Sequence, residues 1–444
     1  MRQVVKRAMG KLNRANRSYT IFVLCAATAI ALPAQSLRTL HYFGRGLKGG
    51  GSGPYAGVVI GSSGVLYGTT DSGGTGACSG GCGTVYSLTP PTSPGGGWTE
   101  RVLHSFTGGS DGTSPYAPVT IGGGGALYGT TIIGGSGSCL PFAGCGTVFS
   151  LTPPTSPGGA WTESVLYSFK GGSDGAEPHG GVVVGDGGVL YGTTQNGGSS
   201  GYGTVFALTP PTSPGGTWSE SVLYSFAGGG GPQSGVVIGQ GGVLYGTTFS
   251  GGTGSCPGAG PGCGTVFSLS PPTSAGGAWT DSVLHSFAGG SDAAEPYAGV
   301  VIGIGGVLYG ATSAGGTGYG TVFSLTPPAS DGGSWTESVL YSFTGGSDGA
   351  QPYGDVVIGS NGALFGTAAA GGADPNPYGY GTVFSMSPPT SAGGPWTEAT
   401  LYSFTGNGGE VPFAGLAIGK GGLLYGTTAR GGHDIIGTVF ELKP

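Results

Sequence analysis

The stretch GGVLYGTT at residues 187–194 returns letter for letter at residues 241–248. Five close variants bring the number of copies to seven, and successive copies are separated by 61, 63, 54, 64, 56 and 60 residues. The aromatic residue of each copy marks the repeat: Tyr67, Tyr128, Tyr191, Tyr245, Tyr309, Phe365 and Tyr425. Repeats of this length are typical of propellers and other tandem arrays.

Three further phrases accompany each copy and divide the repeat into four short strands. A GVVIG-like phrase precedes LYGTT, a GTVF phrase follows it, and a WTESVLYSF-like phrase ends the unit. Gly-rich pairs join the first two strands, and PTSPGG joins the last two, as expected for tight turns. All six tryptophans begin the last phrase: Trp98, Trp161, Trp218, Trp279, Trp335 and Trp396. Strands that are apolar on both faces fit blades that stack around an axis.

The seventh tryptophan phrase is missing after the final GTVFELKP, whereas LRTLHYF at residues 37–43 matches the end of SVLYSF. We therefore predict an all-β, seven-bladed β-propeller of four-stranded blades. Its ring would be closed by residues 37–43, which complete the last blade and remove an open sheet edge. Residues 35–444 would form this single domain.

The N-terminal residues have the composition of a signal peptide. Six of the 14 basic residues precede residue 18, and the apolar stretch IFVLCAATAIAL at residues 21–32 leads into PAQS. We assign residues 1–34 to a signal peptide cleaved after Ala31 or Ala34, with an uncleaved anchor as the alternative. Twelve apolar residues are too few to span a bilayer. We expect a secreted or periplasmic monomer with no membrane span in the mature chain.

The remaining chain is acidic. It holds 8 basic and 20 acidic residues, a net charge of −12, so nucleic acid and anionic lipid are not expected partners. The 105 glycines are accompanied by 37% hydrophobic residues, which argues against disorder.

The pattern DG..PY.GVVIG..GVLYGTT..GG..GYGTVFSLTP resembles the GloVer tandem repeat of exported bacterial proteins, sometimes called choice-of-anchor. The resemblance covers residues 37–444. It implies an extracellular repeat protein, often with a C-terminal sorting signal, and it implies no activity. This sequence ends at Pro444 without such a signal, so we expect free secretion.

Six cysteines are paired between the LYGTT and GTVF phrases of three repeats: Cys78 with Cys82, Cys139 with Cys145, and Cys256 with Cys263. Paired cysteines confined to loops of an exported chain predict disulfides. Structural zinc is the alternative, but each loop lacks the third and fourth ligands. We expect no metal and no cofactor.

The loop face that carries GGSDG..PY and the cysteines is the expected ligand-binding face. The residue at the entry to the first strand of each blade would lie around the channel, and together these residues form a near-ring: Tyr55, Tyr116, His179, Gln233, Tyr297, Tyr353 and Phe413. The aromatic side chains of the near-ring would stack on sugars or fill the mouth of the channel. The SDG aspartates would bind cations or, as we favour, accept turn hydrogen bonds: Asp111, Asp174, Asp292 and Asp348. His104 and His285 replace the tyrosine of LYSF, and we place His41 one position earlier in its strand. We expect all three to be packed strand residues.

A unique site is expected where the repeat breaks. Glu177 and Glu295 flank the fourth-blade entry, which lacks SDG, and would form an acid–base pair for glycoside cleavage or be solvated loop residues. The second break is the seam between the chain ends, where two loops would meet: one with Arg430, His433 and Asp434, the other with Arg45 and Lys48. This cluster would bind an anionic ligand, or His433 would act as the base of a lyase or hydrolase. Charge at a chain junction is the simpler interpretation.

These observations leave three functions open. The first is an exported non-enzymatic propeller that binds a carbohydrate or a cell-surface protein. The second is an extracellular polysaccharide hydrolase or lyase, and the third is a structural envelope or matrix protein. The near-identity of the repeats favours a binding or structural function, because the repeats around an active site usually differ from the others in sequence.

Overall fold

The computed structural model describes the chain from residue 36 onward with short gaps: residues 36–44, 49–93, 95–139, 144–156, 158–213, 215–256, 260–274, 276–330, 332–373, 378–391, 393–432 and 436–444. The chain separates into two units, residues 1–34 and residues 35–444, and the first lies outside the described residues. The assigned signal peptide is therefore not tested. In the described residues no helix is long and apolar enough to cross a membrane.

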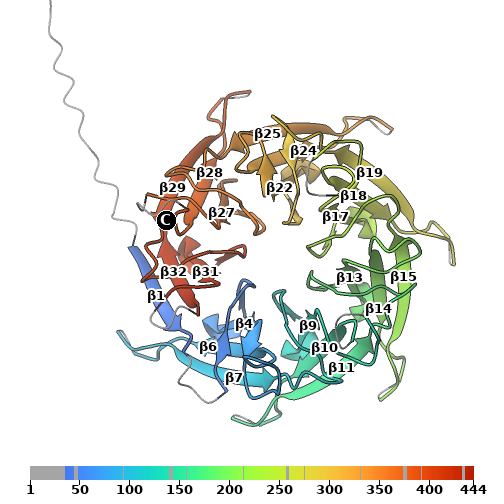
Figure 1. Cartoon of the computed structure of the whole chain (residues 1–444), viewed down its shortest axis with the longest axis vertical. Helices are drawn as coiled ribbons and strands as arrows, with labels where there is room; N and C mark the ends of the chain where they lie inside the picture. Colours follow the sequence, from blue (N-terminus) through green and yellow to red (C-terminus); the bar gives the residue numbers. More distant parts are fainter. Residues whose placement is uncertain are drawn as a thin grey trace, which may run out of the picture. The chain divides into compact units, whose positions relative to one another are not determined.

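The second unit is a ring of seven four-stranded antiparallel sheets around a central axis (Figure 1), so the predicted all-β, seven-bladed propeller is confirmed. In the first blade the order from the axis outward is β3-β4-β6-β7, and the other blades repeat it. In the last blade the outermost strand is β1, which pairs with β32 from Ser36 opposite Lys443 to Tyr42 opposite Thr438.

The strands fall into four positions in the blade. The innermost strands are β3 (Val59–Ile60), β8 (Thr120–Ile121), β12 (Val183–Val184), β16 (Val237–Ile238), β21 (Val300–Ile302), β26 (Val357–Ile358) and β30 (Ala417–Ile418). The second strands are β4 (Leu66–Thr70), β9 (Leu127–Thr131), β13 (Leu190–Thr194), β17 (Leu244–Thr248), β22 (Leu308–Thr312), β27 (Leu364–Ala368) and β31 (Leu424–Thr428). The third strands are β6 (Thr84–Thr89), β10 (Thr147–Thr152), β14 (Thr204–Thr209), β18 (Thr265–Ser270), β24 (Thr321–Thr326), β28 (Thr382–Ser387) and β32 (Thr438–Lys443). The outer strands are β7 (Thr99–Ser105), β11 (Thr162–Ser168), β15 (Ser219–Ser225), β19 (Thr280–Ser286), β25 (Thr336–Ser342), β29 (Thr397–Ser403) and β1 (Ser36–Tyr42).

Short elements complete the described residues. Two-residue strands pair as β2 (Gly51–Ser52) with β5 (Ser72–Gly73) and β20 (Ala293–Ala294) with β23 (Ala314–Gly315). Single 3-10 turns join the first two strands in six blades: η1 (Ser62–Gly64), η2 (Gly123–Gly125), η3 (Asp186–Gly188), η4 (Gln240–Gly242), η5 (Ile304–Gly306) and η6 (Lys420–Gly422).

The first letters of the LYGTT phrase build the core between blades. In β17, Leu244 is fully buried and the Tyr245 ring packs 6.1 Å from that of Trp335 in the next blade. A Cβ on Gly246 would lie 2.6 Å from Cζ of Phe267, so the aromatic ring of the third strand requires glycine beneath it.

The two threonines of the phrase make different hydrogen bonds. The Thr247 hydroxyl donates to the carbonyl oxygen of Ala298 in the next blade at 2.7 Å. The Thr248 hydroxyl lies 2.8 Å from that of Thr265, which begins the third strand. Buried polar groups need such partners. The phrase therefore recurs because the same blade-to-blade contacts recur.

The segment that leads into the innermost strand of each blade, here called the blade entry, contains a proline. The residue before this proline has a positive φ in all seven repeats: Gly53, Ser114, Glu177, Gly231, Glu295, Gln351 and Val411. The N–H group of this residue donates to a carbonyl oxygen two residues before the third strand of the preceding blade, as Val411 does to Tyr380 at 3.0 Å. Five of these residues are not glycine, and a β-branched side chain such as valine is the least compatible with this conformation.

We expect Val411→Gly to raise the free energy of unfolding by up to about 1 kcal/mol. Relief of a left-handed conformation is worth about 1–2 kcal/mol, and the added freedom of glycine in the unfolded chain offsets about 0.4–1 kcal/mol. Urea denaturation of both proteins measures the difference, with Ser114→Gly as a control that should change less. A loss of stability in Val411→Gly would show that the valine side chain, rather than the backbone, determines this position.

Candidate functional site

A cavity of about 370 Å³ lies on the axis of the ring, lined by the segments that enter the innermost strands. The backbones of neighbouring blades are in close contact here: a Cβ on Gly235 would lie 2.6 Å from the carbonyl oxygen of Gly181. This crowding explains why most repeats have glycine two positions before the innermost strand. The walls are therefore mainly backbone and small apolar side chains, typical of a small-molecule site.

All seven residues of the predicted near-ring line this cavity. Five of them pack on one another and form an aromatic collar (Tyr55, Tyr116, Tyr297, Tyr353 and Phe413). Tyr55 stacks on Tyr116 with ring centres 4.9 Å apart, and Tyr353 stacks on Phe413 at 4.7 Å. The flat faces that would stack on sugars are thus largely used within the collar.

The other two ring residues, His179 and Gln233, come from adjacent blades, and the His179 ring packs edge-on against Tyr116 with ring centres 5.7 Å apart. We call these two residues the polar gap. His179 Nδ1 and Gln233 Oε1 are buried atoms without a hydrogen-bond partner in the protein. Burial lowers the pKa of His179 to about 4, outweighing a hydrogen bond with Gln195, so its imidazole is neutral near pH 7. The gap therefore holds neutral, unpaired hydrogen-bonding atoms just beneath the cavity wall.

One carboxylate among the described residues lines the cavity, that of Asp355. It occupies the position that is glycine in five other repeats, and its Oδ1 accepts the N–H of Gly299 at 2.7 Å. The side chain of Asp355 is exposed to the cavity. Desolvation by the surrounding protein raises the pKa of this carboxyl, and the hydrogen bond from Gly299 opposes that shift.

Glu177 and Glu295 occupy equivalent turn positions in blades three and five, and no hydrogen bond joins them in the described part of the chain. Glu177 accepts a hydrogen bond from the Asn196 side chain at 2.8 Å. Burial raises the pKa of Glu295. Their positive φ and their backbone hydrogen bonds are shared by all seven repeats. The geometry thus gives both residues a structural explanation, and their role as an acid–base pair stays a prediction.

The predicted seam site stays untested because four of its members, Arg45, Lys48, His433 and Asp434, lie outside the described residues. Arg430 is described and its side chain is exposed. Its main chain exchanges hydrogen bonds with Glu410, which belongs to the entry of the same blade.

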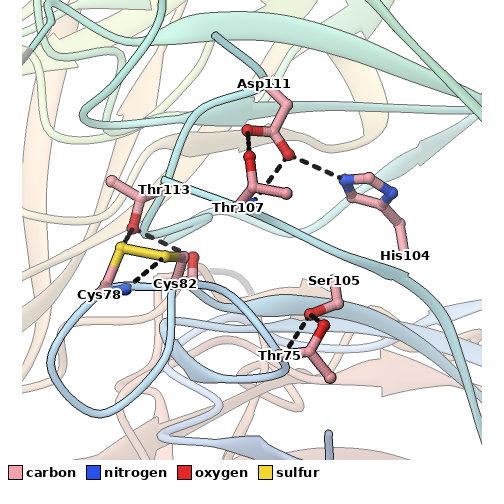
Figure 2. The surroundings of a disulfide bond; sticks show 8 residues. All are labelled: Thr75, Cys78, Cys82, His104, Ser105, Thr107, Asp111 and Thr113. Atoms are coloured by element: carbon pink, nitrogen blue, oxygen red, sulfur yellow. Dashed lines mark hydrogen bonds and ion pairs between the residues drawn. A yellow bond between two sulfur atoms is a disulfide. The ribbon is translucent and has the colours of Figure 1, made fainter. Parts of the chain in front are cut away.

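The three predicted cysteine pairs are disulfides: Cys78–Cys82, Cys139–Cys145 and Cys256–Cys263. Figure 2 shows the first of them beside Thr113, which belongs to the entry of the next blade. The Thr113 hydroxyl donates to the carbonyl oxygen of Cys82 at 3.1 Å. Each disulfide therefore fixes a loop next to a blade entry.

The SDG aspartates accept turn hydrogen bonds, as favoured from the sequence. Asp111 accepts the N–H of Thr107 at 2.9 Å, and Asp174, Asp292 and Asp348 accept the equivalent N–H. The placement of His41 one position earlier was wrong. His41 pairs with Val439 just as His104 pairs with Val85, and each strand has a register shift beside this pair. His41 therefore occupies the same position as His104, that of the tyrosine in LYSF.

Sequence reasoning missed one cavity residue and the unpaired atoms of two others. Asp355 was overlooked although GDVVIG is the single acidic version of the GVVIG-like phrase. The adjacency of His179 and Gln233 was visible in the near-ring, but their lack of hydrogen-bond partners depends on the packing of neighbouring residues.

Known proteins show the fold and the family. One similar solved structure is a fungal alcohol oxidase of the AA5 family in complex with copper, with a TM-score of 0.51 and 14% identity over 91% of this chain and 76% of that one. Another is Trypanosoma rangeli sialidase, with a TM-score of 0.41 and 12% identity over 93% of this chain. This chain spans 59% of the length of that sialidase. Such identities show the fold alone.

No protein among those with curated functions matches the sequence. The family model of the Gloeobacter/Verrucomicrobia repeat matches residues 20–259 and 255–444, which is most of the sequence. The match agrees with the resemblance seen in the repeated phrases, and the chain belongs to the Gloeobacter/Verrucomicrobia repeat family.

Proposed function

We propose that this protein is an exported, non-enzymatic binding module that holds part of a carbohydrate in its axial cavity. The observation that carries the proposal is the polar gap: His179 Nδ1 and Gln233 Oε1 are buried beside the cavity without protein partners. Buried polar atoms are rarely left unpaired, and rotation of these side chains toward the cavity would let the hydroxyl groups of a sugar supply partners.

The rest of the cavity supports a hydroxyl-rich, uncharged or weakly cationic ligand. Asp355 adds a hydrogen-bond acceptor, and the aromatic collar provides apolar surface. A volume of about 370 Å³ is at the lower end of the range for small-molecule sites, about 300–1,000 Å³. We therefore propose that a terminal sugar unit, rather than a long stretch of polysaccharide, enters the cavity.

The proposal is tested by retention of the full chain on insoluble xylan, chitin, pectin and peptidoglycan, followed by titration with oligosaccharides of the polymer that retains it. Gln233→Tyr is the decisive variant, because tyrosine occupies this ring position in four other repeats and would fill the gap. We expect Gln233→Tyr to fold and to bind at least ~10-fold more weakly, since it removes a hydrogen bond and space.

Glu177→Gln and Glu295→Gln serve as controls that leave the cavity unchanged, and both should retain full binding. Undiminished binding by Gln233→Tyr would place the ligand elsewhere. Failure of the unmodified chain to bind any of these polymers would overturn the carbohydrate proposal.

A further inference from the structure

A cluster of three polar side chains recurs where the outer edges of neighbouring blades meet. A residue near the end of one outer strand faces the aspartate of the following SDG loop, and an acidic residue of the next outer strand lies nearby. The described residues contain four such clusters: Tyr167 with Asp174 and Glu220, Tyr341 with Asp348 and Glu398, His104 with Asp111 and Glu163, and His285 with Asp292 and Glu337. Two clusters thus have histidine in place of tyrosine.

The tyrosine clusters are closed by a hydrogen bond, whereas the cluster of His285 is not. The Tyr341 hydroxyl donates to Oδ2 of Asp348 at 2.9 Å. In contrast, Nε2 of His285 lies 3.7 Å from Oδ2 of Asp292, which is too long for a hydrogen bond. His285 Nε2 and Glu337 Oε1 are both buried atoms without a hydrogen-bond partner. The cluster of His285 therefore holds two unpaired ligand atoms, as the cluster of His104 does with His104 Nε2 and Glu163 Oε1.

The spacing of these atoms suits a metal ion. One ligand atom from each of His285, Asp292 and Glu337 lies within 4.8 Å of the other two. Atoms bound to a single zinc ion at about 2.0–2.2 Å lie roughly 3–4 Å apart, so small side-chain movements would bring all three onto one ion. The side chains of His285 and Asp292 are 23% and 22% exposed, which leaves access for water to complete the coordination.

The charge of the cluster also lacks compensation. No lysine or arginine in the described part of the chain forms an ion pair with Asp292 or Glu337. A divalent cation would compensate the two carboxylates, and the neutral imidazole is the form that ligates metals.

We propose that His285, Asp292 and Glu337 bind one divalent transition-metal ion, with zinc as the expected occupant, and that the ion joins the outer edges of two neighbouring blades. Imidazole together with carboxylate favours zinc over calcium, which prefers oxygen ligands alone. Asp292 is already oriented, because its two oxygens accept the N–H groups of Ala288 and Ala293 at 2.8 Å. The proposal departs from the expectation of no metal drawn from the sequence, which considered zinc only at the cysteines.

The cluster of His104 offers a matched comparison within the same chain. Figure 2 shows Asp111 between His104 and Thr107. The Thr107 hydroxyl donates to Oδ1 of Asp111 at 2.6 Å, whereas alanine stands at the equivalent position before Asp292. Asp111 and Asp292 each accept two hydrogen bonds, but in the described part of the chain only the cluster of His285 brings one ligand atom from each of three residues within 4.8 Å.

The experiment is a titration of the full chain, purified without a histidine tag, with Co²⁺ and Zn²⁺ by calorimetry, with the visible absorption of bound Co²⁺ as a second measurement. We expect one tightly bound ion per chain that 1 mM Ca²⁺ does not displace. His285→Tyr should lower the affinity by more than ~100-fold, since changes outside the ligand shell already cost about 10–100-fold. His104→Tyr should leave the affinity unchanged.

Both variants should fold, because tyrosine stands at this strand position in four other repeats. Glu337→Gln provides a second test and should also lose the ion, while circular dichroism verifies its fold. Absence of tight Co²⁺ and Zn²⁺ binding by the unmodified chain would overturn the proposal, as would equal binding by His285→Tyr and His104→Tyr.

Discussion

Phe43→Ala is expected to lower the free energy of unfolding by about 3–5 kcal/mol, the usual cost of removing a buried phenylalanine. Phe43 directly follows β1, is 2% exposed, and packs with its ring centre 5.1 Å from that of Tyr86 in the first blade. Its loss would open a cavity between the last blade and the first. Guanidinium denaturation followed by tryptophan fluorescence measures the change.

Phe343→Ala is the matched control in the middle of the chain, because Phe343 is fully buried and packs 5.1 Å from Phe384. Ile304→Ala is the surface control, since Ile304 is 95% exposed and should change stability by less than about 0.5 kcal/mol. If Phe43→Ala behaved like the surface control, the N-terminal strand would not complete the last blade.

Reduction of the three disulfides is expected to lower the free energy of unfolding by roughly 6–7 kcal/mol. The bonds join residues separated by 4, 6 and 7 positions, and loops of this length contribute about 2–2.5 kcal/mol each by chain entropy. Denaturation curves with and without a phosphine reductant measure the loss. Cys82, Cys145 and Cys263 are fully buried, so the reductant should be added under mildly denaturing conditions.

The double variant Cys78→Ser/Cys82→Ser removes one bond and should show about one third of that loss. Stability of the His285→Tyr variant that responded to a chelator and not to the reductant would instead indicate that the cysteines bind metal. An unchanged denaturation curve after complete reduction would show that the loops contribute nothing to the stability of the ring.

Most of the fold could be predicted because each blade repeats the same contacts. The steps between copies of LYGTT give the number of blades, and four recurring phrases give the strands of each blade. The structure was needed to explain why individual residues of the phrase recur: Gly246 lies beneath the Phe267 ring, and the Thr247 hydroxyl donates a hydrogen bond to the neighbouring blade. A repeat shows that a position is constrained, whereas packing shows what constrains it.

The candidate sites were less predictable because they combine residues from different blades. The seven near-ring residues line one cavity, but the stacking of the aromatic collar and the unpaired atoms of His179 and Gln233 depend on side-chain geometry. The same holds for His285 and Glu337, which belong to the outer strands of two blades. A residue that differs from its equivalents in the other repeats can be recognised in the sequence. The residue that it contacts in the neighbouring blade can be identified only from the structure.

The central claim is that the protein binds a carbohydrate in its axial cavity without cleaving it. The most direct test measures retention of the full chain on the polysaccharide panel and the sugars released in the same tubes. We predict retention that Gln233→Tyr weakens at least ~10-fold, with no released sugar. Release of sugar that Glu177→Gln or Glu295→Gln abolishes would contradict it and show that the protein is a polysaccharide-cleaving enzyme.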